Sequence, residues 1–157
     1  YGKCLMMGDA AHAIVPFYGQ GMNASFEDVR VFNEILDQHG NDWAKVFDQF
    51  QHERAENTNA IADLAIDNFM EMRDRVDDAD FMLKRKIETE LEFEYPDYYS
   101  KYSLVTFRAD VPYARAMHQG RAQDDLLLSW CQQPPVPSNE AMHTQLMDLS
   151  KKFDHGN

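Results

Sequence analysis

A short motif near the start of the chain contains the first residues that could do chemistry, GDAAH at positions 8–12. It follows the apolar run 3–7, whose length and bounding turn residues suit a buried strand. An aspartate at the carboxyl end of such a strand lies where ligands bind in α/β sheets, and small residues after it let a ligand approach the backbone. Asp9 could therefore accept hydrogen bonds from sugar-like hydroxyl groups. The alternative is an ordinary turn or helix-capping aspartate.

A second motif is the glycine-rich segment 19–24, GQGMNA, which fits the pattern G-x-G-x-x-G/A. It is not the usual dinucleotide fingerprint, because Pro16 and Tyr18 separate it from any preceding strand. A glycine-rich turn that opens a helix still presents unpaired N–H groups and the positive end of the helix dipole. Such an end stabilises negative charge on a phosphate or on a planar heterocycle. The alternative is an ordinary helix start that contains glycine.

Asn68 is a polar residue on an otherwise apolar helical stripe. Helical steps from Ile61, Leu64 and Ala65 pass through Asn68 before they reach Met72. An amide on an apolar face costs free energy unless it is hydrogen-bonded. Either another protein group or a ligand must therefore satisfy Asn68.

Metal chemistry is not indicated. His12 could serve as a ligand or a general base, but no second ligand stands at a suitable spacing. Cys4 and Cys131 form neither a disulfide framework nor a metal-binding spacing, and Cys4, inside an apolar run, is expected to be buried. The sequence also contains no recognisable set of nucleophile, histidine and acid. We therefore predict neither a metal site nor a catalytic side chain.

Helices are expected to position these residues. The first should begin near Asn23 or Ser25, both good N-caps, and end at Gly40. Its apolar residues at helical spacing are Phe26, Val29, Phe32 and Leu36. The run 42–75 contains no proline or glycine, which predicts one long helix or two stacked ones. Further helices are expected over 80–94, 113–131 and 139–152, whereas the aromatic and β-branched segment 98–107 should be irregular or extended.

The predicted strand has no partner in the rest of the chain. An unpaired apolar strand is an aggregation hazard, so we expect its sheet to lie upstream of Tyr1. The fold class predicted is a mostly α fragment with one N-terminal strand, part of an α/β fold whose sheet lies largely upstream. Residues 1–40 would form the C-terminal end of that α/β domain, and residues 41–157 a helical C-terminal region.

The net charge of −12, from 27 acidic and 15 basic residues, disfavours two classes of partner. A negative field repels phosphate backbones and anionic lipid, so neither nucleic acid nor a membrane surface is expected to bind. No apolar run approaches the ~18 residues of a membrane-spanning helix, and the first residues do not form a secretory signal. We therefore expect a cytoplasmic protein without a membrane anchor in this chain.

Taken together, GDAAH, Pro16 and GQGMN resemble the second FAD fingerprint of the single-component aromatic hydroxylases. The resemblance implies that residues 1–40 are the end of an α/β FAD-binding domain, so the isolated chain is expected to be inactive. It implies that Asp9 binds the flavin ribityl chain. It also implies that Pro16, Gly21, Met22 and Asn23 border the isoalloxazine ring, with the helix N-terminus facing the pyrimidine edge. His12 is structural in that motif.

Three segments look like the kynurenine 3-monooxygenase branch of this family, namely VPFYGQGMN at 15–23, DNFMEMR at 67–73 and YSLVTF at 102–107. The likeness covers roughly residues 4–118. It implies that Asn68 and Tyr102 bind the amino-acid end of L-kynurenine, with Glu71 and Met72 nearby and Phe17 against the aromatic ring. Tyr18 stands where the family has phenylalanine or histidine, so this wall of the pocket differs slightly.

The resemblance also implies a reaction. NADPH reduces FAD, oxygen forms a flavin C4a-hydroperoxide, and transfer of its distal oxygen hydroxylates the ring, so the cofactor and not a side chain carries the chemistry. One alternative is another FAD hydroxylase or epoxidase with a simpler substrate. A second alternative is a helical interaction module without flavin.

Overall fold

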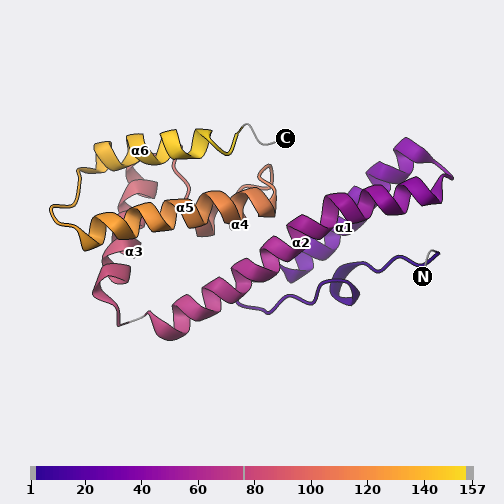
Figure 1. Cartoon of the computed structure of the whole chain (residues 1–157), viewed down its shortest axis with the longest axis horizontal. Helices are drawn as coiled ribbons and strands as arrows, with labels where there is room; N and C mark the ends of the chain where they lie inside the picture. The colour runs from indigo at the N-terminus through magenta and orange to yellow at the C-terminus, as the bar shows by residue number, and fades with distance from the viewer. Residues whose placement is uncertain (1–2, 76, 155–157) are drawn as a thin grey trace. The chain divides into compact units, whose positions relative to one another are not determined.

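The computed structural model describes residues 3–75 and 77–154 of the 157-residue chain. Every regular element within these residues is helical (Figure 1). In chain order they are a 3₁₀ turn at Gly8–Ala10, α1 (Gly21–His39), α2 (Trp43–Asp74), α3 (Ala79–Glu94), α4 (Lys101–Phe107), α5 (Tyr113–Gln132) and α6 (Asn139–Lys151). The chain divides into two compact units, Tyr1–Phe69 and Met70–Asn157.

The first unit is an antiparallel helix pair formed by α1 and the larger part of α2. The predicted stop at Gly40 is confirmed, since its N–H donates to the Leu36 carbonyl at 2.7 Å and its φ is 57°. The run without proline or glycine forms one helix, α2. The two helices bury a shared apolar cluster of Val31, Ile35, Val46 and Phe50.

The predicted inner face of α1 is wrong in part. Phe26 and Val29 are 65% and 51% exposed, and the buried face instead carries Ala24, Asp28, Val31 and Ile35. The helix also begins earlier than expected, with Gln20 as its N-cap in place of Asn23 or Ser25. The changed face follows from Asp28, because Arg54 of α2 binds its buried carboxylate.

The predicted N-terminal strand is also wrong for the described residues. The backbone at Met7 is extended, with φ −141° and ψ 158°, but residues 3–7 join no ladder. A strand needs hydrogen bonds to a partner, and the described part of this chain is helical. Without a covering sheet, Cys4 is exposed, contrary to its expected burial.

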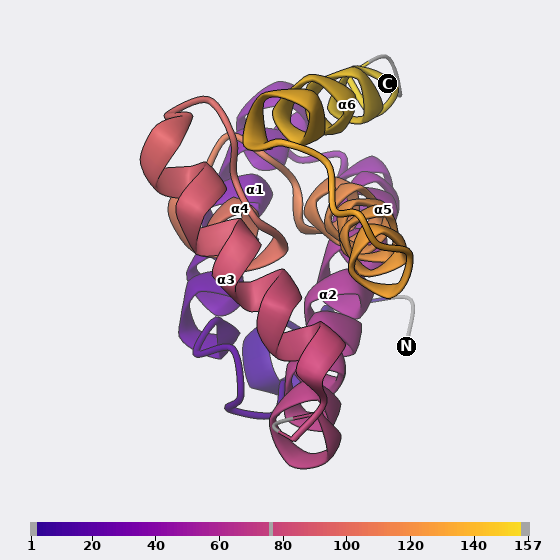
Figure 2. The same cartoon turned by 90° about the vertical axis from the view of Figure 1, so that its left-hand side faces the viewer.

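The second unit packs α3, α5 and α6 around a small core. α5 contacts α3, α4 and α6, and in Figure 2 α3 faces the viewer, with α5 beside it and α6 above. The core residues come from these three helices and from the segment before α4: Ile87, Leu91, Tyr98, Leu127, Cys131, Met142 and Leu146. The helices predicted over 80–94, 113–131 and 139–152 are confirmed within one residue.

The segment 98–107 was predicted to be irregular or extended, and this is wrong for its last seven residues. Lys101–Phe107 forms α4. Ser100 caps it, because its hydroxyl accepts a hydrogen bond from the Ser103 N–H, and its own N–H donates to Glu92 at 2.9 Å. The cap and the packing against α5 outweigh the weak helix preference of its aromatic and β-branched residues.

Gly120 lets α4 lie unusually close to α5. A Cβ atom at this position would stand 2.5 Å from Cγ, 2.7 Å from Cβ and 3.0 Å from Cα of Lys101. The last of these atoms belongs to the backbone, so rotation of the lysine side chain would not relieve the clash. The separation of α4 and α5 therefore depends on the missing side chain.

Gly120→Ala should destabilise the chain by roughly 1–3 kcal/mol, the usual cost of overpacking. The matched control is Gly21→Ala, in another helix, where the nearest atom to the added Cβ is Ile14 Cβ at 3.9 Å. The control should change the free energy of unfolding by at most about 1 kcal/mol. Urea unfolding of both variants provides the measurement. Equal effects would show that the close approach is not a constraint.

Candidate functional site

The GDAAH motif folds into a tight turn beside the start of α1. Gly8 has φ 58°, a region that L side chains rarely adopt, and its carbonyl accepts hydrogen bonds from Ala11 and His12 at 2.8 and 2.9 Å. A Cβ on Gly8 would lie 3.2 Å from the Ser25 hydroxyl. The turn therefore packs closely against the first turns of α1 and leaves the Asp9 side chain exposed.

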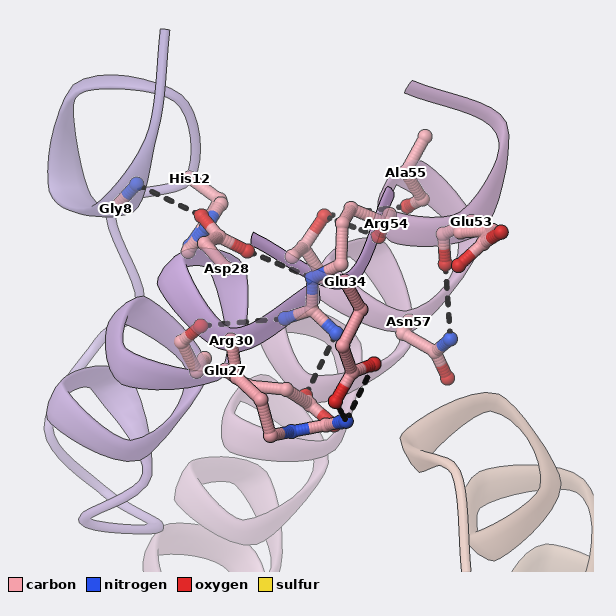
Figure 3. A network of polar contacts seen from close by, with 12 residues as sticks. Gly8, His12, Glu27, Asp28, Arg30, Glu34, Glu53, Arg54, Ala55 and Asn57 are labelled. Atoms are coloured by element: carbon pink, nitrogen blue, oxygen red, sulfur yellow. Dashed lines mark hydrogen bonds and ion pairs between the residues drawn. The ribbon is translucent and has the colours of Figure 1, made fainter. Parts of the chain in front are cut away.

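Asp28 holds this turn in place. Its carboxylate accepts hydrogen bonds from the Gly8 N–H at 2.8 Å, from His12 Nε2 at 2.6 Å and from Arg54 Nε at 2.7 Å (Figure 3). Burial alone would raise the pKa of the Asp28 carboxyl, but these hydrogen bonds outweigh burial and hold the pKa below its usual value. The carboxylate, which is 1% exposed, is therefore charged at neutral pH.

Arg54 extends the network from α2. Its guanidinium donates to Asp28 and also to Glu27 Oε2 at 2.7 Å and to the Ala24 carbonyl at 3.2 Å. One buried arginine thus binds three residues of α1, at positions 24, 27 and 28 (Figure 3). Arginine suits this role because its planar group presents several donors in a fixed geometry.

Neither Asp28 nor Arg54 was predicted from the sequence as a site-forming residue. A signal was present, since Asp28 lies four residues after Ala24 and three before Val31, on what proves to be the buried face. Arg54 likewise lies four residues after the buried Phe50 and four before Thr58. A buried acid and a buried base at helical spacing on two consecutive helices predict an ion pair between them.

The glycine-rich turn leads directly into α1, as predicted. The side chain of the N-cap residue Gln20 does not cap the first turn, and its Oε1 accepts a hydrogen bond from Asn23 Nδ2 at 2.8 Å. The predicted flavin-facing residues are at the surface here, with Pro16, Met22 and Asn23 exposed and Gly21 partly so. Their roles stay predictions.

Asn68 has a protein partner. Its Nδ2 donates to the Phe17 carbonyl at 2.6 Å, so it ties the turn before α1 to α2. The Phe17 and Phe69 rings also pack at 4.6 Å. The sequence left open whether a protein group or a ligand satisfies Asn68. For the amide nitrogen the partner is a protein group, and the amide oxygen can still accept a hydrogen bond. Tyr18, expected in the pocket wall, is buried.

The other predicted substrate residues belong to the second unit. Glu71 Oε1 accepts a hydrogen bond from Lys101 Nζ at 2.6 Å, and Lys101 immediately precedes Tyr102. The Tyr102 ring is 44% exposed and packs edge-on against Phe107. Met72, which was expected on the apolar stripe, is 60% exposed. Glu71 and Tyr102 are thus linked through one lysine.

A cavity of about 300 Å³ lies beside the Asp28 network, on the side of α2. Its lining includes Cys4, His12, Asp28, Arg54 and Thr58, and none of the predicted flavin or substrate residues. Among residues 3–75 and 77–154 no group of three or more metal-ligating side chains is found. In the same part of the chain, no helix combines the length and apolar character needed to cross a bilayer.

Known proteins are similar to this chain along most of its length. A family described as "FAD binding domain" matches residues 1–65. Kynurenine 3-monooxygenase of Cytophaga hutchinsonii is 42% identical over 154 residues, which cover 95% of this chain and 34% of the relative. The motifs' likeness to kynurenine 3-monooxygenases thus extends over 80–95% of this chain.

Further relatives agree with this likeness. The Flavobacterium johnsoniae kynurenine 3-monooxygenase is 48% identical over 126 residues, covering 80% of this chain and 28% of the relative. That of Dictyostelium discoideum is 45% identical over 139 residues, covering 80% and 30%. The chain thus spans about a third of the length of these relatives. The family resemblance inferred from the motifs is confirmed.

Asp28→Ala should destabilise the first unit by about 3–5 kcal/mol, because it leaves the buried Arg54 guanidinium without its innermost partner. The control is Glu34→Ala on the same helix, which removes an exposed pair with Arg30 and should cost under about 0.5 kcal/mol. Urea unfolding of both variants measures the difference. In the double variant Asp28→Ala/Arg54→Met, part of the loss should be recovered. Equal costs for Asp28→Ala and Glu34→Ala would contradict a central role for Asp28.

Proposed function

We propose that this chain forms one side of the active site of an FAD- and NADPH-dependent monooxygenase that converts L-kynurenine to 3-hydroxykynurenine. The observation that supports the proposal most is that Asp28 joins the two fingerprint segments. It binds the Gly8–His12 turn from α1, the helix that the glycine-rich turn opens. The names of the similar proteins agree with this activity.

The exposed groups around these segments suit a flavin. Asp9 offers a carboxylate to the hydroxyl groups of the ribityl chain, and charge-assisted bonds of this kind are among the stronger ones. The N-terminus of α1 begins at Gly21 without a side-chain cap from Gln20, so its N–H groups can face an anionic ring. The apolar side chains of Val15, Phe17 and Met22 are exposed, as a planar heterocycle would require.

Bound flavin would supply the redox chemistry, taking a hydride from NADPH and activating oxygen. The chain's own residues would position it. Pro16, Gly21, Met22 and Asn23 would border the ring, and the positive end of α1 would favour negative charge on its pyrimidine edge. Because the amino group of kynurenine itself activates the aromatic ring, no side-chain nucleophile is needed.

The substrate would be held by polar groups at its amino-acid end. Asn68 and Tyr102 would bind this zwitterion, with Glu71 and Met72 nearby. Phe17 would contact the aromatic ring, and Tyr18 would form part of the pocket wall beside it. An amino-acid zwitterion needs several polar partners, and a simple phenol does not. This difference separates a kynurenine hydroxylase from related flavin hydroxylases.

Asp9→Ala in the full-length protein should weaken FAD binding by roughly 1.5–3 kcal/mol, the worth of a hydrogen bond to a charged group. Substrate preference should not change. Asp63→Ala, which removes another exposed carboxylate of the same unit, is the control. The flavin dissociation constants of Asp9→Ala, the control and the unmodified protein are measured by fluorescence titration of the apoproteins. Equal constants for Asp9→Ala and the unmodified protein would remove Asp9 from the site.

Tyr102→Phe in the flavin-loaded enzyme should weaken kynurenine binding about tenfold, near 1.4 kcal/mol, with flavin content unchanged. Asn68→Ala should do the same and also lower the melting temperature, because it breaks the bond to Phe17. Misplaced substrate should raise the yield of hydrogen peroxide per NADPH oxidised.

Tyr95→Phe is the control, since it removes the hydroxyl that donates to Glu94 at the surface. Normal kynurenine affinity in Asn68→Ala despite lost stability would leave Asn68 with a purely structural role. If the unmodified enzyme hydroxylates simple phenols and does not bind kynurenine, the proposed substrate is wrong.

A further inference from the structure

The second unit contains a cluster of buried charges that the proposed function does not use. Lys101 Nζ lies 2.6 Å from Glu71 and 2.5 Å from Asp124 Oδ2. Lys84 Nζ lies 2.5 Å from the other oxygen of Asp124 and 3.2 Å from Glu88. Asp124 thus lies between two buried lysines. Glu71, at the other side of Lys101, is the more exposed of the two carboxylates that Lys101 contacts.

Burial decides how this cluster behaves. Lys84 is 2% exposed and Lys101 is 7% exposed, so neither ammonium group can be hydrated and both need carboxylate partners. Burial alone would lower the pKa of Lys101, but Asp124 and Glu71 outweigh it and raise the pKa above its usual range. Burial raises the pKa of Glu88 to about 7, against the attraction of Lys84. Lys101 is therefore charged at neutral pH.

The backbone is arranged so that Lys101 can reach these partners. Gly120 removes the side chain that would otherwise occupy the place of the lysine's Cβ and Cγ. Ser100 caps α4 and so fixes Lys101 as the first residue of the helix. The side chain of Lys101 points inward between α4 and α5, while that of its neighbour Tyr102 is 44% exposed.

We propose that Lys101 is a positioning residue for substrate binding. It holds the Glu71 carboxylate by direct contact, and its anchorage to Asp124 fixes the first turn of α4, which carries the Tyr102 phenol. Lys101 is itself too buried to touch the substrate. This inference rests on the proposed function, in which Glu71 and Tyr102 lie at the amino-acid end of kynurenine.

The test uses the flavin-loaded full-length enzyme. Lys101→Met keeps the length of the side chain and removes its charge, and it should raise the kynurenine dissociation constant about tenfold while flavin content stays unchanged. Peroxide yield per NADPH should rise with it. Lys101→Arg keeps the charge and should restore part of the affinity. The control is Lys86→Met, which removes an exposed lysine of α3 that pairs with Glu90 at 3.7 Å.

A double-mutant cycle separates positioning from general stability. If Lys101 acts through Glu71, the effects of Lys101→Met and Glu71→Gln on kynurenine affinity should not add. A lower melting temperature with normal affinity and coupling would overturn the proposal, as would full additivity. Should Lys101→Met fail to fold, the same cycle is run in the Asp124→Asn background, where the buried carboxylate of Asp124 is not left without Lys101. An unmodified enzyme that does not bind kynurenine would instead refute the proposed function.

Discussion

The Asp28 carboxylate is the constraint on which the first unit depends. A buried charge is tolerated only when it is paired and hydrogen-bonded, and Asp28 meets this requirement with donors from three separate places in the chain. These are the Gly8 N–H, the His12 ring and the Arg54 guanidinium. Satisfying the charge therefore brings the GDAAH turn, α1 and α2 together. Apolar contacts stabilise the same pair of helices but do not involve the GDAAH turn. They are made by Val31, Ile35, Val46 and Phe50.

The second unit uses a similar arrangement with the signs reversed. There the buried groups in need of partners are two lysines, and Asp124 forms ion pairs with both. Such clusters contribute little net stability compared with apolar residues of equal volume, because desolvation offsets the attraction. What they do provide is geometry, since each charge permits few arrangements of its neighbours. This is the property that a wall of a binding site requires.

The helices could be predicted from the sequence because their signals are local. Long runs without glycine or proline, and stops at Gly40 and Pro96, give α2 and the end points of α1 and α3. The lack of a strand at residues 3–7 and the presence of α4 could not be predicted in this way, because each depends on its surroundings. A strand exists only with a partner, and α4 depends on the Ser100 cap and on close packing at Gly120.

The candidate site was predictable only as far as a family motif extends. The fingerprint segments predict flavin-binding roles for Asp9 and the glycine-rich turn, and these roles stay predictions. No motif pointed to Asp28, Arg54 or Lys101. Asp28 pairs with Arg54, 26 positions away, and Lys101 with Asp124, 23 positions away, so neither contact is encoded locally. A charged residue at a buried helical position was the available signal. It was hidden on α1 because a competing apolar stripe runs along the opposite face.

That competing stripe carries information of its own. Phe26 and Val29 recur at helical spacing, as a core-facing pattern should, yet they remain exposed in the first unit. With Val31 and Ile35 packed on α2, α1 therefore has apolar residues on two faces, and only one is covered by the described residues. A helix that is apolar on both sides is suited to an interior position, and exposed apolar patches mark contact surfaces. The buried charge selects which face meets α2, so the apolar pattern alone could not have decided it.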